Sequence, residues 1–319
     1  MILMGDSINQ NELNEYLYFL NYTDYLKELC ELEIKTIFGI KPDKKYFIYS
    51  KYIDPSRSVF IKGCIKISYR ENSLEDLVLA VRADHLHYDG YKINYKKIDE
   101  DVPYEERLRA LNLLGYSIIG KFALQDPFID FAITKVNEKW IFGQYIKNDA
   151  SWLLRRKKPC NYSYALDHSL AKSLINIAVG DNLSLKLVDP CCGVGTVIIE
   201  GRHTGVDIKG YEINTEVVNK CNRNLRYFKF KDDVENKNIE DITEFYDVAI
   251  VDLPYGKFSK TTLSEQELII RKTRDIAKKA VFITMGDMDQ MMTNCGFRVS
   301  ETCLVQKREE FSRYITICY

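Results

Sequence analysis

The sequence has no apolar run that approaches the roughly 20 residues of a membrane-spanning helix. Its first residues, MILMGDSINQNELNEYL, become polar and acidic too soon for a signal peptide. We therefore expect a cytoplasmic protein that makes no contact with a membrane. The nine cysteines include no Cys-x-x-Cys pair, and the four histidines form no cluster with cysteines or carboxylates at metal-ligand spacing. These absences argue against a disulfide framework and a metal centre, so we assign no metal ligand.

An excess of either charge is also missing. Lys and Arg number 45 against 46 Asp and Glu, which argues against a surface that coats nucleic acid along its whole length but leaves room for a local basic patch. Internal repeats and low-complexity tracts are absent as well. With 319 residues, 46% of them hydrophobic, the chain can bury the cores of two globular domains.

The clearest change in composition lies at residues 147–165, KNDASWLLRRKKPCNYSYA, where four consecutive cations, a proline and polar residues follow a strand-like segment. We predict a first domain at residues 1–150, a basic linker at 151–163 and a second domain at 164–319.

The first domain mixes helical and strand patterns. Residues 15–39 have apolar side chains at helical spacing, and so do 73–83 and 103–118. Strand patterns occur at residues 46–53, 59–70, 91–98, 128–136 and 139–146. This arrangement predicts an α+β domain.

The second domain alternates strictly between strands and helices. We expect aliphatic strands at 185–190, 207–213, 246–254 and 280–286, helices at 169–180, 196–203, 216–228 and 264–280, and a closing strand pair at 297–308 and 312–319. Buried strands that alternate with helices predict an α/β fold with a parallel sheet covered on both faces. Ligands of such sheets bind beyond the carboxyl ends of the strands.

The loop VDPCCGVGT, residues 188–196, follows the first of these strands. Gly193 and Gly195 allow the backbone to approach a ligand, and a helix that starts at Thr196 directs its free N–H groups to the same place. A dinucleotide-binding loop would need a third glycine where Ile198 stands, and a phosphate-binding P-loop would need Gly-Lys-Ser/Thr. Both nucleotide interpretations are therefore disfavoured, the dehydrogenase among them.

Two later features fit a different ligand. Glu212 ends the second strand about 20 residues after the loop, where a carboxylate accepts hydrogen bonds from a ribose diol. VDLPYG, residues 251–256, places an acid, a proline-stiffened turn and an aromatic ring at another strand end. Asp252 and the carbonyl beside Pro254 can accept the hydrogens of an exocyclic amino group, while Tyr255 stacks on the base that carries it.

Together DPCCGVGT, GYEIN and DLPYG resemble, in order and spacing, three motifs of the class I S-adenosylmethionine-dependent methyltransferases. The resemblance implies a Rossmann-like domain with a seven-stranded, mostly parallel sheet and S-adenosylmethionine as cofactor. It assigns catalysis to Asp252, Pro254 and Tyr255, the adenine contact to Asn238 with Asp241 as its rival, and the other cofactor contacts to Asp189, Cys191, Gly193, Gly195, Thr196, Glu212, Ile213 and Asp252.

The first domain narrows the expected substrate. Residues 91–145 resemble the RNA-binding THUMP region of tRNA guanosine-N2 methyltransferases, with ALQDP at 123–127 as an imperfect match to their DLxNP segment, and in that family DLPYGK accompanies guanosine N2 as the target. The resemblance therefore implies a tRNA methyltransferase. We expect the cations Arg155, Arg156, Lys157, Lys158 and Lys257 to bind RNA phosphates.

Other functions remain open from the sequence. The motif DLPYG recognises an amino group and does not specify which base carries it. Methylation of ribosomal RNA guanosine N2 or of adenine N6 is therefore the enzymatic alternative. A non-catalytic RNA-binding protein with a vestigial methyltransferase fold is the alternative from another class. The sequence leaves open whether a small activating protein is required.

Overall fold

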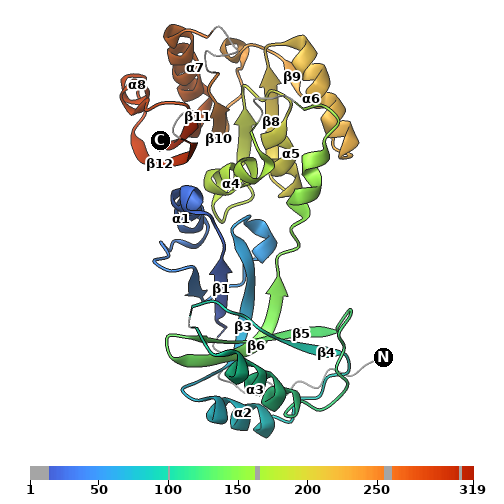
Figure 1. Ribbon diagram of the computed structural model, residues 1–319. Coiled ribbons are helices and arrows are strands. Elements are labelled where there is room, and N and C mark those ends of the chain that lie inside the picture. Colours follow the sequence, from blue (N-terminus) through green and yellow to red (C-terminus); the bar gives the residue numbers. More distant parts are fainter. Residues whose placement is uncertain (1–13, 100, 162–165, 255–260, 309–310) are drawn as a thin grey trace. The chain divides into compact units, whose positions relative to one another are not determined.

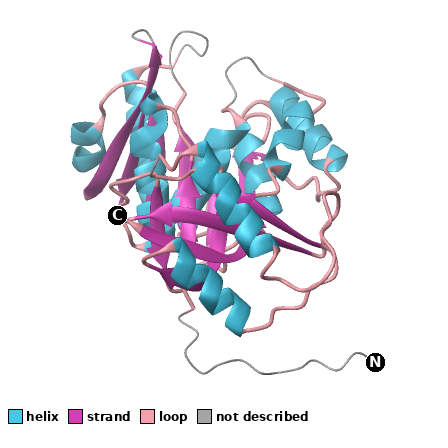
Figure 2. Ribbon diagram, turned by 60° about the horizontal axis from the view of Figure 1, so that its bottom comes forward, coloured by secondary structure: helices cyan, strands magenta, loops and turns pink. Residues whose placement is uncertain are grey.

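The computed structural model describes residues 14–99, 101–161, 166–254, 261–308 and 311–319 (Figure 1). Contacts divide the chain into two compact units. Figure 2 distinguishes their helices and strands by colour. Unit 1 holds residues 1–21, 42–56 and 60–149, and unit 2 holds residues 22–41, 57–59 and 150–319. Within the described ranges, no helix has the length and apolar character needed to cross a bilayer.

Unit 1 is built on a six-stranded sheet with the order β2-β1-β3-β6-β5-β4. Among the described strand pairs of this sheet, β4–β5 is parallel and the others are antiparallel. The elements are β1 (Tyr16–Leu20), β2 (Tyr46–Tyr49), β3 (Ile61–Glu71), α2 (Leu74–Ala83), β4 (Tyr91–Tyr95), α3 (Tyr104–Gly115), β5 (Ile129–Val136) and β6 (Lys139–Lys147). Leu77 of α2 and Leu114 of α3 pack with Phe131 and Phe142 of the sheet. The expected α+β architecture is confirmed.

One expected helix is partly wrong. Residues 15–39 read as a single helical pattern, but Tyr16–Leu20 forms β1, which pairs with β2 on one side and with β3 on the other. A short strand buried on both faces lacks strict alternation, so periodicity alone did not separate it from a helix. The helix α1 (Lys27–Phe38) starts only after the 3₁₀ turn η1 (Asp24–Leu26).

Unit 2 contains a seven-stranded sheet with the order β12-β13-β11-β10-β7-β8-β9. Its strands are β7 (Lys186–Asp189), β8 (Asp207–Glu212), β9 (Glu235–Asn236), β10 (Tyr246–Asp252), β11 (Ala277–Thr284), β12 (Val299–Arg308) and β13 (Phe311–Cys318). The five from β9 to β11 in this order are parallel, and β13 runs antiparallel to β11 and β12. This topology, with one reversed strand near the edge, confirms the expected class I methyltransferase fold.

The helices of unit 2 follow the expected alternation. Besides α1 they are α4 (His168–Val179), α5 (Thr196–His203), α6 (Thr215–Tyr227), α7 (Leu263–Ile276) and α8 (Asp289–Asn294). The 3₁₀ turns η3 (Ser151–Lys157) and η4 (Ile239–Asp241) also belong to unit 2. A further 3₁₀ turn among the described residues is η2 (Pro55–Arg57). The helix expected at 264–280 is too long, because its last residues begin β11.

The first domain predicted at 1–150 does not coincide with unit 1. Helix α1 packs on α4, and the Nδ2 of Asn176 donates to Glu33 Oε1 at 2.8 Å. Arg57 Nη2 donates to the carbonyl of Gly180 at 2.7 Å. Two pieces of the N-terminal half therefore complete the core of unit 2.

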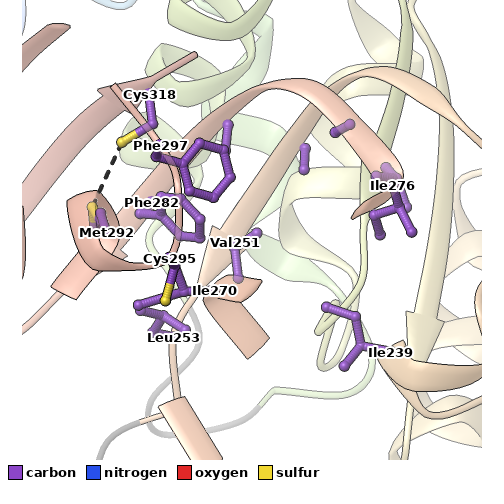
Figure 3. Packing of buried hydrophobic residues seen from close by; sticks show 14 of the residues in the cluster. Ile239, Val251, Leu253, Ile270, Ile276, Phe282, Met292, Cys295, Phe297 and Cys318 are labelled. Atoms are coloured by element: carbon purple, nitrogen blue, oxygen red, sulfur yellow. Dashed lines mark hydrogen bonds between the residues drawn. The ribbon is translucent and has the colours of Figure 1, made fainter. Parts of the chain in front are cut away.

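A cluster of buried hydrophobic residues in unit 2 includes side chains from β10 (Figure 3). Val251 and Leu253 are buried there with Phe282, Phe297 and Met292. Since successive side chains of a strand point to opposite faces, this packing turns Asp252 away from the cluster.

Candidate functional site

A cavity of about 660 Å³ lies at the carboxyl ends of β7, β8 and β10, as expected for a sheet of this kind. It brings together residues that are far apart in the sequence. The predicted site residues that line it are Asp189, Cys191, Gly193, Thr196, Glu212, Ile213, Asn238, Asp252 and Pro254. Tyr255 and Lys257 lie outside the described residues.

Glu212 holds the glycine loop in place. Its Oε2 accepts a hydrogen bond from the backbone N–H of Gly193 at 3.0 Å, and its Oε1 accepts from the N–H of Asn214 at 3.0 Å. Gly193 has a φ of +53°, and a Cβ added there would have no protein atom within 4 Å. Gly193 therefore leaves open space beside the loop.

Gly195 serves a different purpose from the one expected. It does not line the cavity. Its φ is +83°, it precedes the first residue of α5, and an added Cβ would overlap the Sγ of Cys221. The position needs glycine for the turn and for packing against α6, whereas its contact with the cofactor stays a prediction.

Acidic side chains outnumber basic ones among the described residues that line the cavity. Burial raises the pKa of Asp189 well above its ordinary value, and the Asp252 and Glu212 carboxylates add to the effect. Burial also raises the pKa of Asp252 to about 7, although Arg313 opposes the shift. The Oδ1 atom of Asp252 is buried and has no hydrogen-bond partner among the described residues. A buried carboxylate oxygen without a donor fits a ligand that brings its own N–H or O–H.

One residue that the sequence motifs did not indicate contacts Pro254, two residues after Asp252. Gln266 Nε2 donates to the carbonyl oxygen of Pro254 at 2.7 Å. Gln266 belongs to the first turn of α7, which begins with a capping box between Thr262 and Glu265. The capping box of Thr262 and Glu265 can be recognised in the sequence, but the contact of Gln266 with Pro254 depends on how α7 packs against β10.

Asn238 lines the cavity together with Ile239 and Glu240. Its side chain caps η4 by accepting from the Glu240 N–H at 3.4 Å. Its rival Asp241 is exposed and is not among the lining residues. The contact of Asn238 with adenine stays a prediction.

Two of the cations assigned to RNA are turned inward. Arg155 is 5% exposed and pairs with Glu200, and Lys158 is 5% exposed and donates to the hydroxyl of Thr196. Their assignment to RNA phosphates is wrong, because buried side chains cannot reach a phosphate backbone. Arg156 and Lys157 are exposed.

Residues 155–295 match the family model of the RMKL-like methyltransferase domain. This stretch, which is less than half of the chain, is similar to a methyltransferase domain.

Curated relatives agree with this identification. The chain is 23% identical over 197 residues to the tRNA (guanine(10)-N2)-dimethyltransferase of Methanothermobacter thermautotrophicus. This alignment covers 59% of this chain and 58% of the relative. It is 24% identical over 175 residues to the tRNA (guanine(10)-N2)-dimethyltransferase of Pyrococcus abyssi, which covers 50% of this chain and 52% of the relative. These alignments span little more than half the length of each relative.

Among solved structures, the TrmN protein of Thermus thermophilus superposes with a TM-score of 0.49 at 11% identity, over 95% of this chain and 99% of that one. A putative methyltransferase, SMU.472, complexed with S-adenosylhomocysteine superposes with a TM-score of 0.44 at 10% identity, over 95% and 98% of the two chains.

S-adenosylmethionine is the cofactor that the sequence motifs imply for this domain. The cavity residues fit this molecule, because Gly193 leaves space beside the backbone and the carboxylates of Asp189 and Glu212 are available to its ammonium and hydroxyl groups. The individual contacts remain proposals.

Proposed function

We propose that the protein transfers a methyl group from S-adenosylmethionine to the exocyclic N2 amino group of a guanosine in tRNA. The observation that carries the proposal is the buried Oδ1 of Asp252, which has no hydrogen-bond partner among the described residues and belongs to the lining of the cavity together with Pro254. The two relatives named for guanine-N2 methylation of tRNA support this choice of target. As part of the proposal, unit 1 is the THUMP-like region that binds the RNA, and the reaction takes place in the cytoplasm.

The chemistry required of the protein is mainly positioning. S-adenosylmethionine supplies a methyl group that is already activated by its sulfonium sulfur. The guanine amino group is a poor nucleophile, because its lone pair is delocalised into the ring. Asp252 accepts one amino hydrogen and the Pro254 carbonyl accepts the other, which localises the lone pair on nitrogen and directs it at the methyl carbon.

The hydrogen bond from Gln266 is compatible with this role of Pro254. A carbonyl oxygen has two lone pairs, so it can accept from Gln266 and from the substrate at the same time. Gln266 then fixes the carbonyl in place before the base arrives.

The bonds and protons balance in a single displacement. The bond between sulfur and the methyl carbon breaks as the bond between N2 and that carbon forms, and S-adenosylhomocysteine leaves. The extra proton on N2 passes to Asp252, whose raised pKa makes it a better proton acceptor than an ordinary carboxylate.

A base inside a helix cannot reach such a cavity, so the target nucleotide must be flipped out of its stack. We propose that Tyr255 stacks on the flipped guanine and that Lys257 and the exposed Arg156 and Lys157 bind phosphates nearby.

The test is methyl transfer from labelled S-adenosylmethionine to unmodified tRNA, with ribosomal RNA and DNA in parallel, followed by nucleoside digestion and mass spectrometry. We expect N2-methylguanosine from tRNA alone and no product with Asp252→Asn. Methylation of adenine, or of ribosomal RNA in preference to tRNA, would show that the proposed substrate is wrong. Cofactor binding without transfer to any of the three would favour the vestigial RNA-binding protein.

A further inference from the structure

The basic segment at residues 155–158 is tied to helix α5, whose first turn lines the cavity. Arg155 Nε and Nη2 donate to Glu200 Oε1 and Oε2 at 2.8 and 2.7 Å, and His168 Nδ1 lies 2.7 Å from the same Oε1. Burial alone would raise the pKa of Glu200, but the hydrogen bonds from His168 and Arg155 hold it below its ordinary value. The charges of Arg155 and Glu200 therefore compensate one another.

Lys158 has no such compensation. Its ammonium donates to Thr196 Oγ1, and within the described ranges it has no carboxylate at ion-pair distance. Burial lowers the pKa of Lys158 to about 8, against the more distant Cys221, Glu200 and Asp167, so the group is mainly protonated at pH 7. A buried cation without an anion is costly unless a ligand supplies the negative charge.

The contact with Lys158 also orients the hydroxyl of Thr196. An ammonium group only donates, so Thr196 Oγ1 is the acceptor and its own hydrogen is left for another partner. Thr196 is 3% exposed, lines the cavity and donates to no other described residue in the structure. No side chain caps the N-terminus of α5, so its first N–H groups are also available.

Elsewhere the cavity is unsuited to an anion. The carboxyl groups that line it are Asp189, Glu212, Glu240, Asp252 and Glu265. The lysine among the described lining residues, Lys237, is flanked by Glu235 and Glu244 at 3.8 Å each. The positive potential in this cavity is therefore concentrated at the first turn of α5.

We propose that Lys158, acting through the Thr196 hydroxyl and the first turn of α5, is the positioning residue for the α-carboxylate of the amino-acid part of S-adenosylmethionine. The inference rests on S-adenosylmethionine as the cofactor and is independent of the RNA target. It predicts that Lys158 discriminates between ligands that carry this carboxylate and ligands that lack it.

Calorimetric titration with two ligands tests the inference. S-adenosylhomocysteine carries the amino-acid part, whereas 5′-methylthioadenosine shares its adenosine and thioether but has no carboxylate. We expect Lys158→Met to weaken S-adenosylhomocysteine about 10-fold or more, the range for a lost hydrogen-bonded charge, and to change methylthioadenosine less than about 3-fold. Lys158→Arg keeps the charge and should retain most of the preference.

An exposed lysine outside the proposed sites provides the control. Lys186→Met removes a cation at the first residue of β7, at the strand end away from the cavity, and should leave both affinities unchanged. Equal weakening of both ligands by Lys158→Met would mean that Lys158 only supports the fold, and unchanged affinity for both would mean that its charge does not reach the ligand. Either result overturns the proposal.

A second variant covers the case in which Lys158→Met does not fold. Thr196→Val keeps the volume and removes the hydroxyl, so it too should weaken S-adenosylhomocysteine selectively; an unselective effect or none would contradict the inference. If the wild-type protein binds neither ligand, S-adenosylmethionine is not its cofactor, and the inference fails with that assignment. Wild-type protein that binds both but methylates no RNA would refute the proposed function and leave this inference standing.

Discussion

At the scale of single residues, Asp252 combines two properties that rarely occur together. It is a carboxyl group at the end of a central strand, yet its Oδ1 is buried with no donor among the described residues. Burial raises its pKa to about 7. Such a group is poorly satisfied in the free protein and is improved by a ligand that donates hydrogen bonds to it.

This property predicts how activity depends on pH. The carboxylate form accepts the amino hydrogen, so kcat/KM should rise about tenfold per pH unit below the pKa and level off above about pH 7. An ordinary carboxyl group would produce this limb near pH 4. Initial rates with a fixed tRNA between pH 5.5 and 8.5 measure it, and a flat profile across this range would contradict the assignment of Asp252 as acceptor.

The same shift predicts the stability of the Asp252→Asn variant. A carboxyl whose pKa is raised by folding favours the native state below pH about 4, and that contribution is lost as the pH rises from about 4 to about 7. Asparagine has no charge to bury, so at pH 8 the inactive variant should be more stable than the wild type by roughly 1–3 kcal/mol. Urea unfolding at pH 8 measures the difference, and a less stable variant would show that the carboxylate has a stabilising partner.

At the scale of elements, the loop between β7 and α5 contains two glycines that look equivalent in the sequence. Both have a positive φ, but Gly193 borders open space whereas Gly195 packs against Cys221. Glycine at 193 leaves space for a ligand, whereas glycine at 195 allows the loop to pack against Cys221.

Two single substitutions separate these demands. Gly193→Ala should cost about 1–2 kcal/mol for the left-handed backbone and weaken S-adenosylhomocysteine by about tenfold or more, because its methyl group projects beside the ligand. Gly195→Ala adds a steric overlap and should cost about 3 kcal/mol or more. Thermal unfolding and ligand titration of the two variants measure both effects; equal losses of stability would contradict the distinction.

The elements also show what could be predicted from the sequence. Most strands and helices of unit 2 were predictable from local periodicity, but β9 and α8 were missed because they are too short to show a pattern. Nine lining residues between Asp189 and Pro254 were predictable because they belong to motifs at strand ends. The burial of Arg155 and Lys158 was not predictable, because the sequence of four cations does not show which of them face solvent and which pair with a buried group such as Glu200. The role of Gln266 was hidden for the same reason, because its partner arises from tertiary packing.

At the scale of the whole molecule, unit 2 is assembled from three separate pieces of the chain. Helix α4 is buried along nearly its whole length, from Leu170 to Val179. Part of that cover is α1, whose Glu33 accepts a hydrogen bond from Asn176. The methyltransferase domain of this chain is therefore larger than the stretch that matches the family model.

A fragment of residues 150–319 tests this extension. Without α1 it exposes apolar surface of α4 and leaves Asn176 without its partner, so we expect a lower unfolding temperature than that of unit 2 in the full chain and faster proteolysis. A synthetic peptide of residues 22–41 should restore part of the resistance to protease. A fragment as stable as unit 2 in the full chain would show that α1 is dispensable.

The pairing of α1 with α4 also has a consequence for biosynthesis. Glu33 and Asn176 are 143 residues apart. At a synthesis rate of 5–20 residues per second, α1 leaves the ribosome about 7–30 seconds before its partner helix exists. During that interval Leu29, Ile34 and Ile37, which are buried in the finished protein, have no native surface to cover them. The nascent chain is thus most exposed to aggregation and to chaperones while unit 1 is being made.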